Sequence, residues 1–141
     1  MSAKRAKELG VASAVPILGF GQGHSSWEVA QRPDMTTTGA VVSSRTAYEM
    51  AGCGPGDIDV AQLYDCFTIT AMVTLEDYGF CEKGEGGPFC EGGRLPGLQL
   101  ILEGVRQMRG TANLQVADAA KCIVSNQGGI MHTHSTLILG Q

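Results

Sequence analysis

The sequence has little charge, few aromatic side chains and no long apolar run. Charged residues make up 17% and aromatic residues 6% of its 141 residues, and the formal net charge is −4. A mildly acidic chain without a basic cluster lacks the electrostatic pattern of a nucleic-acid-binding or membrane-surface protein. No apolar run reaches the length that spans a bilayer, and residues 1–5 contain no apolar core of a signal peptide. We therefore expect a cytoplasmic protein that binds neither nucleic acid nor a membrane.

The sequence also lacks the cysteine spacing of a disulfide framework or a zinc site. Its cysteines are odd in number and none belongs to a C-x-x-C pair: they are Cys53, Cys66, Cys81, Cys90 and Cys122. Reduced thiols are a better interpretation than disulfides or bound zinc. His132 and His134 have a spacing that metal ligands share, but no third ligand accompanies them in the sequence. We predict no metal site.

Glycine, in contrast, is abundant. It provides 20 of the 141 residues, about twice its usual share, and glycine permits tight turns and close approaches between backbones. The glycine runs at 19–23 and 84–87 are weak candidates for phosphate cradles, because neither lies between a strand and a helix in the required way. With a hydrophobic content of 43%, the chain can bury the core of one domain.

Hydrophobic periodicity predicts alternating strands and helices. We expect strands at 15–20, 58–63, 121–125 and 130–139, helices at 39–51, 66–78 and 98–109, and a loop at 81–97. This order predicts an α/β fold with a mostly parallel sheet, flanking helices and a C-terminal antiparallel hairpin. Residues 1–10 are expected to be the tail of a helix that begins upstream, and residues 11–141 form the domain.

Polar residues at the predicted helix starts have structural as well as chemical interpretations. Any of the hydroxyls in Thr36–Thr38 could cap the helix at 39–51. Asp65 is well placed to cap the next helix, and this role is favoured over that of orienting a catalytic neighbour. Cys66 is expected to be a small buried hydrophobe rather than a nucleophile, because no histidine partner stands at a readable spacing.

Several motifs together resemble one family. The tract YDCFT at 64–68, followed by EDYGF at 76–80 and KGEGG at 83–87, resembles the thiolase superfamily. Within it, the chain is most similar to the bacterial lipid-transfer-protein branch, which is related to the sterol-carrier-protein thiolases and includes steroid side-chain aldolases. Further matching runs are GQGH at 21–24, AQRPD at 30–34, EGVRQMRG at 103–110, QV at 115–116, GGI at 128–130 and HSTL at 134–137.

The resemblance covers nearly the whole chain but only the C-terminal half of such proteins. The family fold packs two similar halves as sheet, helices and sheet. The chain departs from the family pattern at Asn126, which stands where thiolases carry a proton-shuttling cysteine two residues before the double glycine. An amide cannot shuttle a proton near neutral pH, which counts against ordinary thiolysis.

A second departure lies after Pro96. Family members carry a glycine-rich active-site segment there, with the catalytic histidine of true thiolases or a tyrosine-rich motif of the aldolase branch. Here Pro96 passes straight to Gly97 and Leu98. We expect that the protein has lost this segment or that the sequence given omits it.

Tyr64 is the catalytic residue that the resemblance implies. In the aldolase branch the matching tyrosine belongs to an acid/base pair whose second member lies in the absent segment. A free tyrosine has a pKa of about 10, so the site would have to lower that pKa or couple the phenol to a second group. The alternative interpretation is a tyrosine at a strand end with a packed ring and a hydrated hydroxyl.

The resemblance also implies a pocket around the glycine turn. The backbone N–H groups of Gly128 and Gly129 could bind the oxyanion of a thioester, with Asn126 and His24 in the pocket wall. His134 matches the family's His-Ser-Thr run and is expected to support catalysis. Coenzyme A is expected as part of the substrate, and no bound cofactor is predicted.

The function implied is C–C bond cleavage by retro-aldol chemistry, or acyl transfer, on an acyl-CoA thioester, with little activity expected from this chain alone. The alternative is a non-catalytic subunit that binds acyl-CoA or lipid or serves as a scaffold. A third possibility is that the chain is a fragment of a longer or split enzyme. We expect a homodimer, and the resemblance adds a small partner protein with a zinc ribbon and an OB-fold. The acyl group cannot be identified from the sequence.

Overall fold

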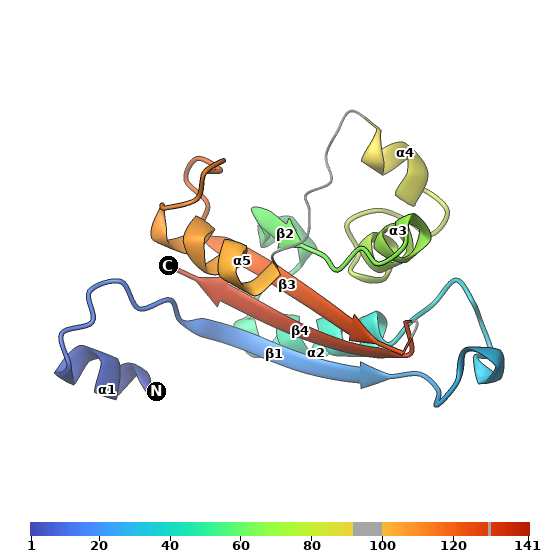
Figure 1. Ribbon diagram of the computed structural model, residues 1–141, viewed down its shortest axis with the longest axis horizontal. Helices are drawn as coiled ribbons and strands as arrows, with labels where there is room; N and C mark the ends of the chain where they lie inside the picture. The colour runs from blue at the N-terminus through green and yellow to red at the C-terminus, as the bar shows by residue number, and fades with distance from the viewer. Residues whose placement is uncertain (92–99, 130) are drawn as a thin grey trace.

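The computed structural model describes residues 1–91, 100–129 and 131–141. Its centre is a four-stranded sheet in the order β1-β4-β3-β2 (Figure 1). The strands are β1 (Ile17–His24), β2 (Val60–Gln62), β3 (Lys121–Gly128) and β4 (Thr133–Gly140). The α/β class and the C-terminal hairpin, formed by β3 and β4, are confirmed.

The prediction of a mostly parallel sheet is right for strand direction but wrong for strand pairing. β1, β2 and β3 all run the same way, but β4 lies between β1 and β3 and runs against both. The only parallel pair is β2 with β3 among the described strands. After the hairpin turn, β4 lies between β3 and β1 and is antiparallel to both. Two of the three strand pairings are therefore antiparallel.

Helices cover the two faces of the sheet (Figure 1). On one face, α2 (Ala40–Ala51) and α3 (Thr68–Asp77) contribute to a core with Ile123 and Ile138. On the other face, α5 (Leu100–Arg109) packs on β2, β3 and β4. The remaining helices are α1 (Ala3–Glu8), α4 (Gly86–Cys90) and the 3₁₀ turns Val29–Gln31 and Pro55–Asp57.

Alternate glycines on β1 explain how closely α2 approaches the sheet. A Cβ atom at Gly19, Gly21 or Gly23 would lie 2.2, 2.0 or 1.9 Å from a backbone oxygen of α2 or its cap. Because alternate strand residues share a face, this stripe allows the helix to rest directly on the strand. These glycines serve helix packing, which is the reason for their spacing.

The start of α3 differs from the prediction. Asp65 is not its cap, because the helix begins at Thr68 after the extended residue Phe67. The hydroxyl of Thr70 accepts a hydrogen bond from the Phe67 N–H at 3.3 Å. At the other helix, the predicted threonine cap is wrong, because the N-cap of α2 is Gly39; Thr38 lies one residue earlier, and its Oγ1 accepts from the Ala40 N–H at 3.0 Å.

Three further boundaries are corrected. β2 is shorter than predicted, and α4 occupies part of the stretch that was expected to be a loop. Residues 126–128, expected in a turn, are the last residues of β3. The predicted helix start at Leu98 and the junction after Pro96 lie outside the described residues. In the described ranges, every helix is too short or too polar to cross a bilayer.

Candidate functional site

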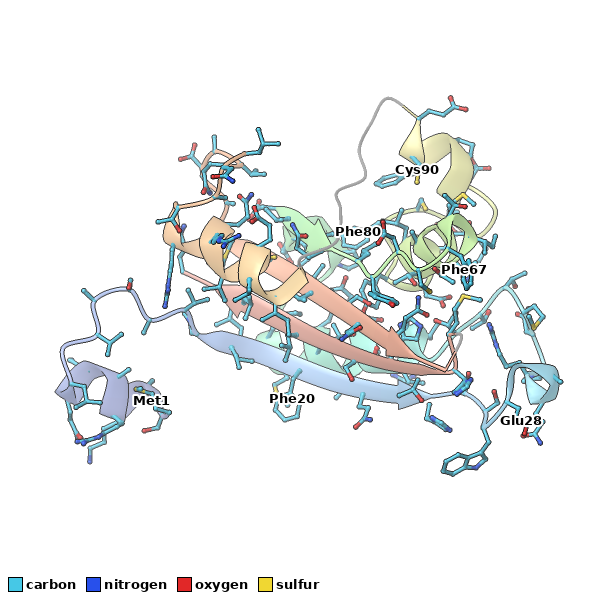
Figure 2. The ribbon with its side chains drawn as sticks, in the orientation of Figure 1. Met1, Phe20, Glu28, Phe67, Phe80 and Cys90 are labelled. Atoms are coloured by element: carbon cyan, nitrogen blue, oxygen red, sulfur yellow. The ribbon has the colours of Figure 1, made fainter. Side chains whose placement is uncertain are left out.

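Most of the predicted site residues lie at one end of the sheet. Since β1, β2 and β3 run the same way, their carboxyl ends lie together beside the start of β4 (Figure 1). Figure 2 shows Glu28 and Phe67, which follow β1 and β2, toward this end and Met1 toward the other. The carboxyl ends of strands are where open α/β sheets commonly bind ligands.

Two cross-strand rows of polar residues form an exposed surface at this end. One row pairs His24 of β1 with Thr133 of β4, and Thr133 with Gly128 of β3. The next row pairs Gln22 with Ser135, and Ser135 with Asn126. We call the side chains of these two rows the polar platform; they are Gln22, His24, Asn126, Thr133 and Ser135.

Alternation along the strands fixes which face the platform occupies. The neighbouring positions Gly23, Ser125 and Thr136 point toward α2 and α3, because Thr136 Oγ1 hydrogen-bonds Ser43 of α2 at 2.8 Å. The platform residues therefore lie on the opposite face, the one that α5 covers elsewhere. Thr133 is half-buried and the other four platform residues are exposed.

Tyr64 lies next to this platform. The parallel ladder ends where Gln62 pairs with Val124, and Tyr64 follows two residues later. Its backbone oxygen accepts a hydrogen bond from Gln127 Nε2 at 3.5 Å, which ties the segment after β2 to the end of β3. Tyr64 is half-buried, and no hydrogen bond to its phenol is found among the described residues.

His24 and Asn126 are held in place by neighbouring groups. His24 Nδ1 lies 2.7 Å from Thr133 Oγ1, and its ring contacts the exposed Trp27 edge-on at 4.9 Å between centroids. Asn126 Oδ1 accepts a hydrogen bond from the Gln127 N–H at 2.9 Å. This bond leaves the Asn126 amide group free to donate toward the platform.

The bend after β3 requires glycine. Gly129 has a φ of +58°, and a Cβ atom there would lie 1.9 Å from His132 Nε2. Gly128 and Gly129 are exposed. The bend therefore brings bare backbone beside the row that holds His24 and Thr133, where backbone N–H groups can donate to a ligand.

His134 lies on the other face. It is 1% exposed, and both of its ring nitrogens lack a hydrogen-bond partner among the described residues. Burial, and then the positive charge of Arg32, lower its pKa from 6.5 to about 4, so the imidazole is neutral at pH 7. The structure thus separates His134 from the platform, although their positions are one or two residues apart.

The same buried face carries a hydroxyl network that sequence reasoning missed. Tyr78 Oη lies 2.6 Å from Thr136 Oγ1, which also bonds Ser43. Burial raises the pKa of Tyr78, so the phenol stays protonated. The three hydroxyls belong to separate elements, so no spacing in the sequence predicts that they lie together. They have in common only that all three are buried.

A buried acid holds the segment that leads to α2. Asp77 Oδ2 accepts from the Thr38 N–H at 2.8 Å and from its hydroxyl at 2.6 Å. Lys83 Nζ lies 2.5 Å from Asp77 Oδ1, and it also donates to the Thr36 carbonyl. The Asp77 side chain is fully buried, so this pair fixes the loop before α2 against the end of α3.

The five cysteines differ in burial. All five thiols are free, and the described ranges contain no group of three His, Cys, Asp or Glu side chains that could hold a metal. Burial raises the pKa of Cys122 to about 12. Cys66 was expected to be buried but is exposed, with Gln127 Nε2 3.4 Å from its sulfur, because it lies outside α3.

Comparison with known proteins identifies the family of the chain. The family model described as "Thiolase C-terminal domain-like" matches residues 21–97 and 94–141. The chain belongs to this thiolase C-terminal domain-like family. The two matched stretches meet at 94–97, beside the junction after Pro96. The predicted membership of the thiolase superfamily is confirmed.

The relatives include an aldolase and an acetyltransferase, the two kinds of enzyme that the resemblance implied. The chain is 34% identical over 133 residues to the steroid side-chain-cleaving aldolase of Thermomonospora curvata, covering 80% of this chain and 32% of that protein. It is 48% identical over 63 residues to an acetyl-CoA acetyltransferase of Methanothermobacter thermautotrophicus, covering 44% and 16%. A solved structure titled Ltp2-ChsH2(DUF35) aldolase superposes with a TM-score of 0.78 and 33% identity, covering 89% and 39%.

The chain therefore spans well under half the length of these relatives. In the aldolase relative and the solved aldolase structure it corresponds to about a third of the chain, 32% and 39%. The family and the fold are shared over most of this sequence.

Proposed function

We propose that, in the complete protein, this domain acts on an acyl-CoA thioester and cleaves or forms the C–C bond beside it. The observation that carries the proposal is the position of Tyr64, whose backbone oxygen bonds Gln127, the residue after Asn126 of the exposed polar platform. A benzoylsuccinyl-CoA thiolase subunit covers 92% of the chain at 30% identity, whereas the aldolase relatives are more similar, at 34% and 33%, which favours retro-aldol cleavage over acyl transfer. Asn126 supports the same choice, because an amide cannot replace the proton-shuttling cysteine of thiolysis.

The reaction proposed is a retro-aldol cleavage of a β-hydroxyacyl thioester. A base removes the proton of the β-hydroxyl, the Cα–Cβ bond breaks, and a ketone leaves. The bonding electrons pass to Cα and the thioester carbonyl, which forms an enolate. Protonation at Cα then gives the shortened acyl-CoA.

In this scheme Tyr64 transfers a proton, and neighbouring donors hold the enolate oxygen. The phenol has no competing partner among the described residues, so it is free to engage the substrate. The backbone N–H groups at Gly128 and Gly129 and the amide of Asn126 are the proposed oxyanion donors. His24 borders the same surface and is proposed to line the acyl-CoA site.

We infer a protein assembly for this activity. The solved aldolase relative is a complex of two named proteins, which supports a partner subunit for this family member. We propose a small partner with a zinc ribbon and an OB-fold, together with a homodimer of the complete protein. Coenzyme A enters as part of the substrate.

The test is the substitution Tyr64→Phe in the complete protein. We expect kcat to fall by about 10²- to 10⁴-fold, the typical contribution of a positioned proton-transfer group. Unfolding temperature should stay unchanged, because the phenol makes no described hydrogen bond. A Tyr48→Phe variant, which removes an α2 hydroxyl that donates to the Tyr78 carbonyl, should retain kcat. Near-normal turnover by Tyr64→Phe would remove this residue from the mechanism.

A further inference from the structure

A row of three aromatic rings begins at the glycine bend after β3. A Cβ atom at Gly129 would lie 1.9 Å from His132 Nε2, so the His132 ring rests directly on the bend. His132 and His24 meet edge-on, with ring centroids 5.8 Å apart, and His24 meets Trp27 edge-on at 4.9 Å. These contacts lead without interruption from the bend to the loop after β1. We call the side chains of His132, His24 and Trp27 the aromatic wall.

Hydrogen bonds hold the aromatic wall in place. His24 Nδ1 lies 2.7 Å from Thr133 Oγ1, which ties its ring to the neighbouring strand β4. The Ser25 N–H donates to the His132 carbonyl at 2.8 Å, which ties the loop that carries Trp27 to the residues after the bend. A surface that is ordered before its ligand arrives loses less conformational entropy on binding. The wall is therefore suited to binding.

The aromatic wall is also accessible. Trp27 is 82% exposed, His24 is exposed, and His132 is half-buried. A ligand can therefore contact the indole without displacing any described side chain. Flat rings are favoured partners for such a surface, because paired rings gain free energy beyond that of the apolar area they bury.

The charges near the aromatic wall favour an uncharged ligand. Residues 22–31 and 126–135 carry the wall and the bend; they contain no lysine or arginine, and Glu28 is their only carboxylate. Arg32 follows directly, but it is only 7% exposed. The phosphates of coenzyme A favour cationic partners, so the adenine nucleotide is poorly suited to this surface. An uncharged ring of the acyl group has no such requirement.

We propose that the aromatic wall holds the acyl group of the substrate and selects an acyl group that carries a flat ring. This inference rests on the proposed function, in which the N–H groups at Gly128 and Gly129 hold the thioester oxygen. His24 lies two strands from Gly128, about 10 Å away, because neighbouring strands are about 4.8 Å apart. An acyl group that begins at the bend therefore passes His132 and then reaches His24 and Trp27.

The test uses the fluorescence of Trp27, the only tryptophan of the chain, which reports directly on the aromatic wall. The 141-residue chain is titrated with the phenylacetyl and octanoyl thioesters of N-acetylcysteamine, which have equal carbon numbers and carry no nucleotide. We expect saturable quenching, with about fivefold tighter binding of the phenylacetyl thioester, the magnitude of a ring pair. N-acetyltryptophanamide, the control for collisional quenching, should show no saturation.

The octanoyl thioester makes this titration decisive, because a merely apolar surface would bind the straight chain at least as tightly as the ring. Equal or weaker binding of the phenylacetyl thioester, or the absence of saturable quenching by it, would overturn the proposal. That result would leave the retro-aldol mechanism at Tyr64 standing, because the titration involves no turnover.

A pair of substitutions assigns the binding to the aromatic wall. His24→Ala removes the ring that contacts Trp27, so it should weaken binding of the phenylacetyl thioester about fivefold. Phe20→Ala is the matched control, because it removes another exposed aromatic ring of β1 that lies outside the wall. It should bind like the unsubstituted chain. An unchanged affinity in a folded His24→Ala chain, or equal losses in both variants, would contradict the assignment.

The complete protein tests whether the aromatic wall faces the substrate there. Trp27→Ala should raise KM about tenfold for a β-hydroxyacyl-CoA that carries a phenyl ring. It should leave kcat, and the KM for a straight-chain substrate of equal carbon number, unchanged. An unchanged KM for the ring-bearing substrate would mean that the acyl group does not reach Trp27, and would overturn the proposal. Failure to cleave either substrate would instead refute the proposed function, whereas ring-selective quenching in the 141-residue chain would still support the wall.

Discussion

The two faces of the sheet at its carboxyl end differ although they use neighbouring residues of the same strands. Gln22, Asn126 and Ser135 lie on the exposed face, where none of the described helices covers them. Gly21, one position before Gln22, and His134, one position before Ser135, lie against the helices on the other face. A shift of one residue along a strand thus separates an exposed polar surface from a buried polar interior.

The largest effect on stability should come from the helix-packing stripe of β1. Gly21→Val places a side chain where a Cβ atom alone would lie 2.0 Å from the Ser43 carbonyl oxygen. We expect a loss of about 3 kcal/mol in the free energy of unfolding, or failure to fold. Gln22→Val, on the exposed face, should change it by less than about 0.5 kcal/mol. Chemical denaturation of both variants checks this contrast, and equal losses would show that the two faces are not distinct.

An effect of similar size should come from acid. The folded-state pKa of His134 is lowered to about 4 from an ordinary value of 6.5. Below pH 6.5 the unfolded chain therefore gains a proton that the folded chain does not, and stability falls as the pH decreases toward 4. The loss should reach about 3 kcal/mol, in order of magnitude.

Substituting His134 measures its own contribution to the loss of stability in acid. His134→Gln should remove most of the decrease between pH 6.5 and pH 4, as measured by urea unfolding at each pH. His24→Gln, a change on the exposed platform, should leave the decrease in place. If His24→Gln removed it and His134→Gln did not, the assignment of the buried histidine would be wrong.

A third effect concerns the segment that supports the buried face. Asp77→Asn weakens the ion pair with Lys83 and the hydrogen bonds to Thr38. Removing one partner of a buried pair costs several kcal/mol, but Lys83 is 44% exposed, so we expect about 2 kcal/mol. Asp34→Asn, at an exposed carboxylate, serves as the control. Thermal unfolding of both variants should show a larger decrease for Asp77→Asn.

Much of the architecture could be predicted from sequence because it depends on local patterns. The helix at 40–51 ends at Gly52, whose φ of +64° suits glycine, and the predicted range was within one residue. The start of α3 could not be placed as well, because both Asp65 and Thr70 have capping side chains and only tertiary packing decides between them. The short helix α4, with the sequence GGPFC, carries no helical periodicity.

The candidate site was predictable in its location but not in its division between two faces. Alternation placed His132 and His134 on one face, but no sequence signal says which face the helices cover. Arg32 illustrates the same limit: an arginine beside a proline in a polar loop is usually exposed, and here it is buried. Its burial follows from the loop's attachment to distant residues, such as the bond from Thr38 to Asp77.

The most direct test of the account is a crystal structure of the complete protein with a bound acyl-CoA or a non-cleavable analogue. We predict that the thioester carbonyl lies over the row that contains Asn126, within hydrogen-bond distance of the Tyr64 phenol or of the N–H groups at Gly128 and Gly129. A thioester bound on the helix-covered face, or beyond the reach of Tyr64, would contradict the assignment of the exposed platform as the reactive surface.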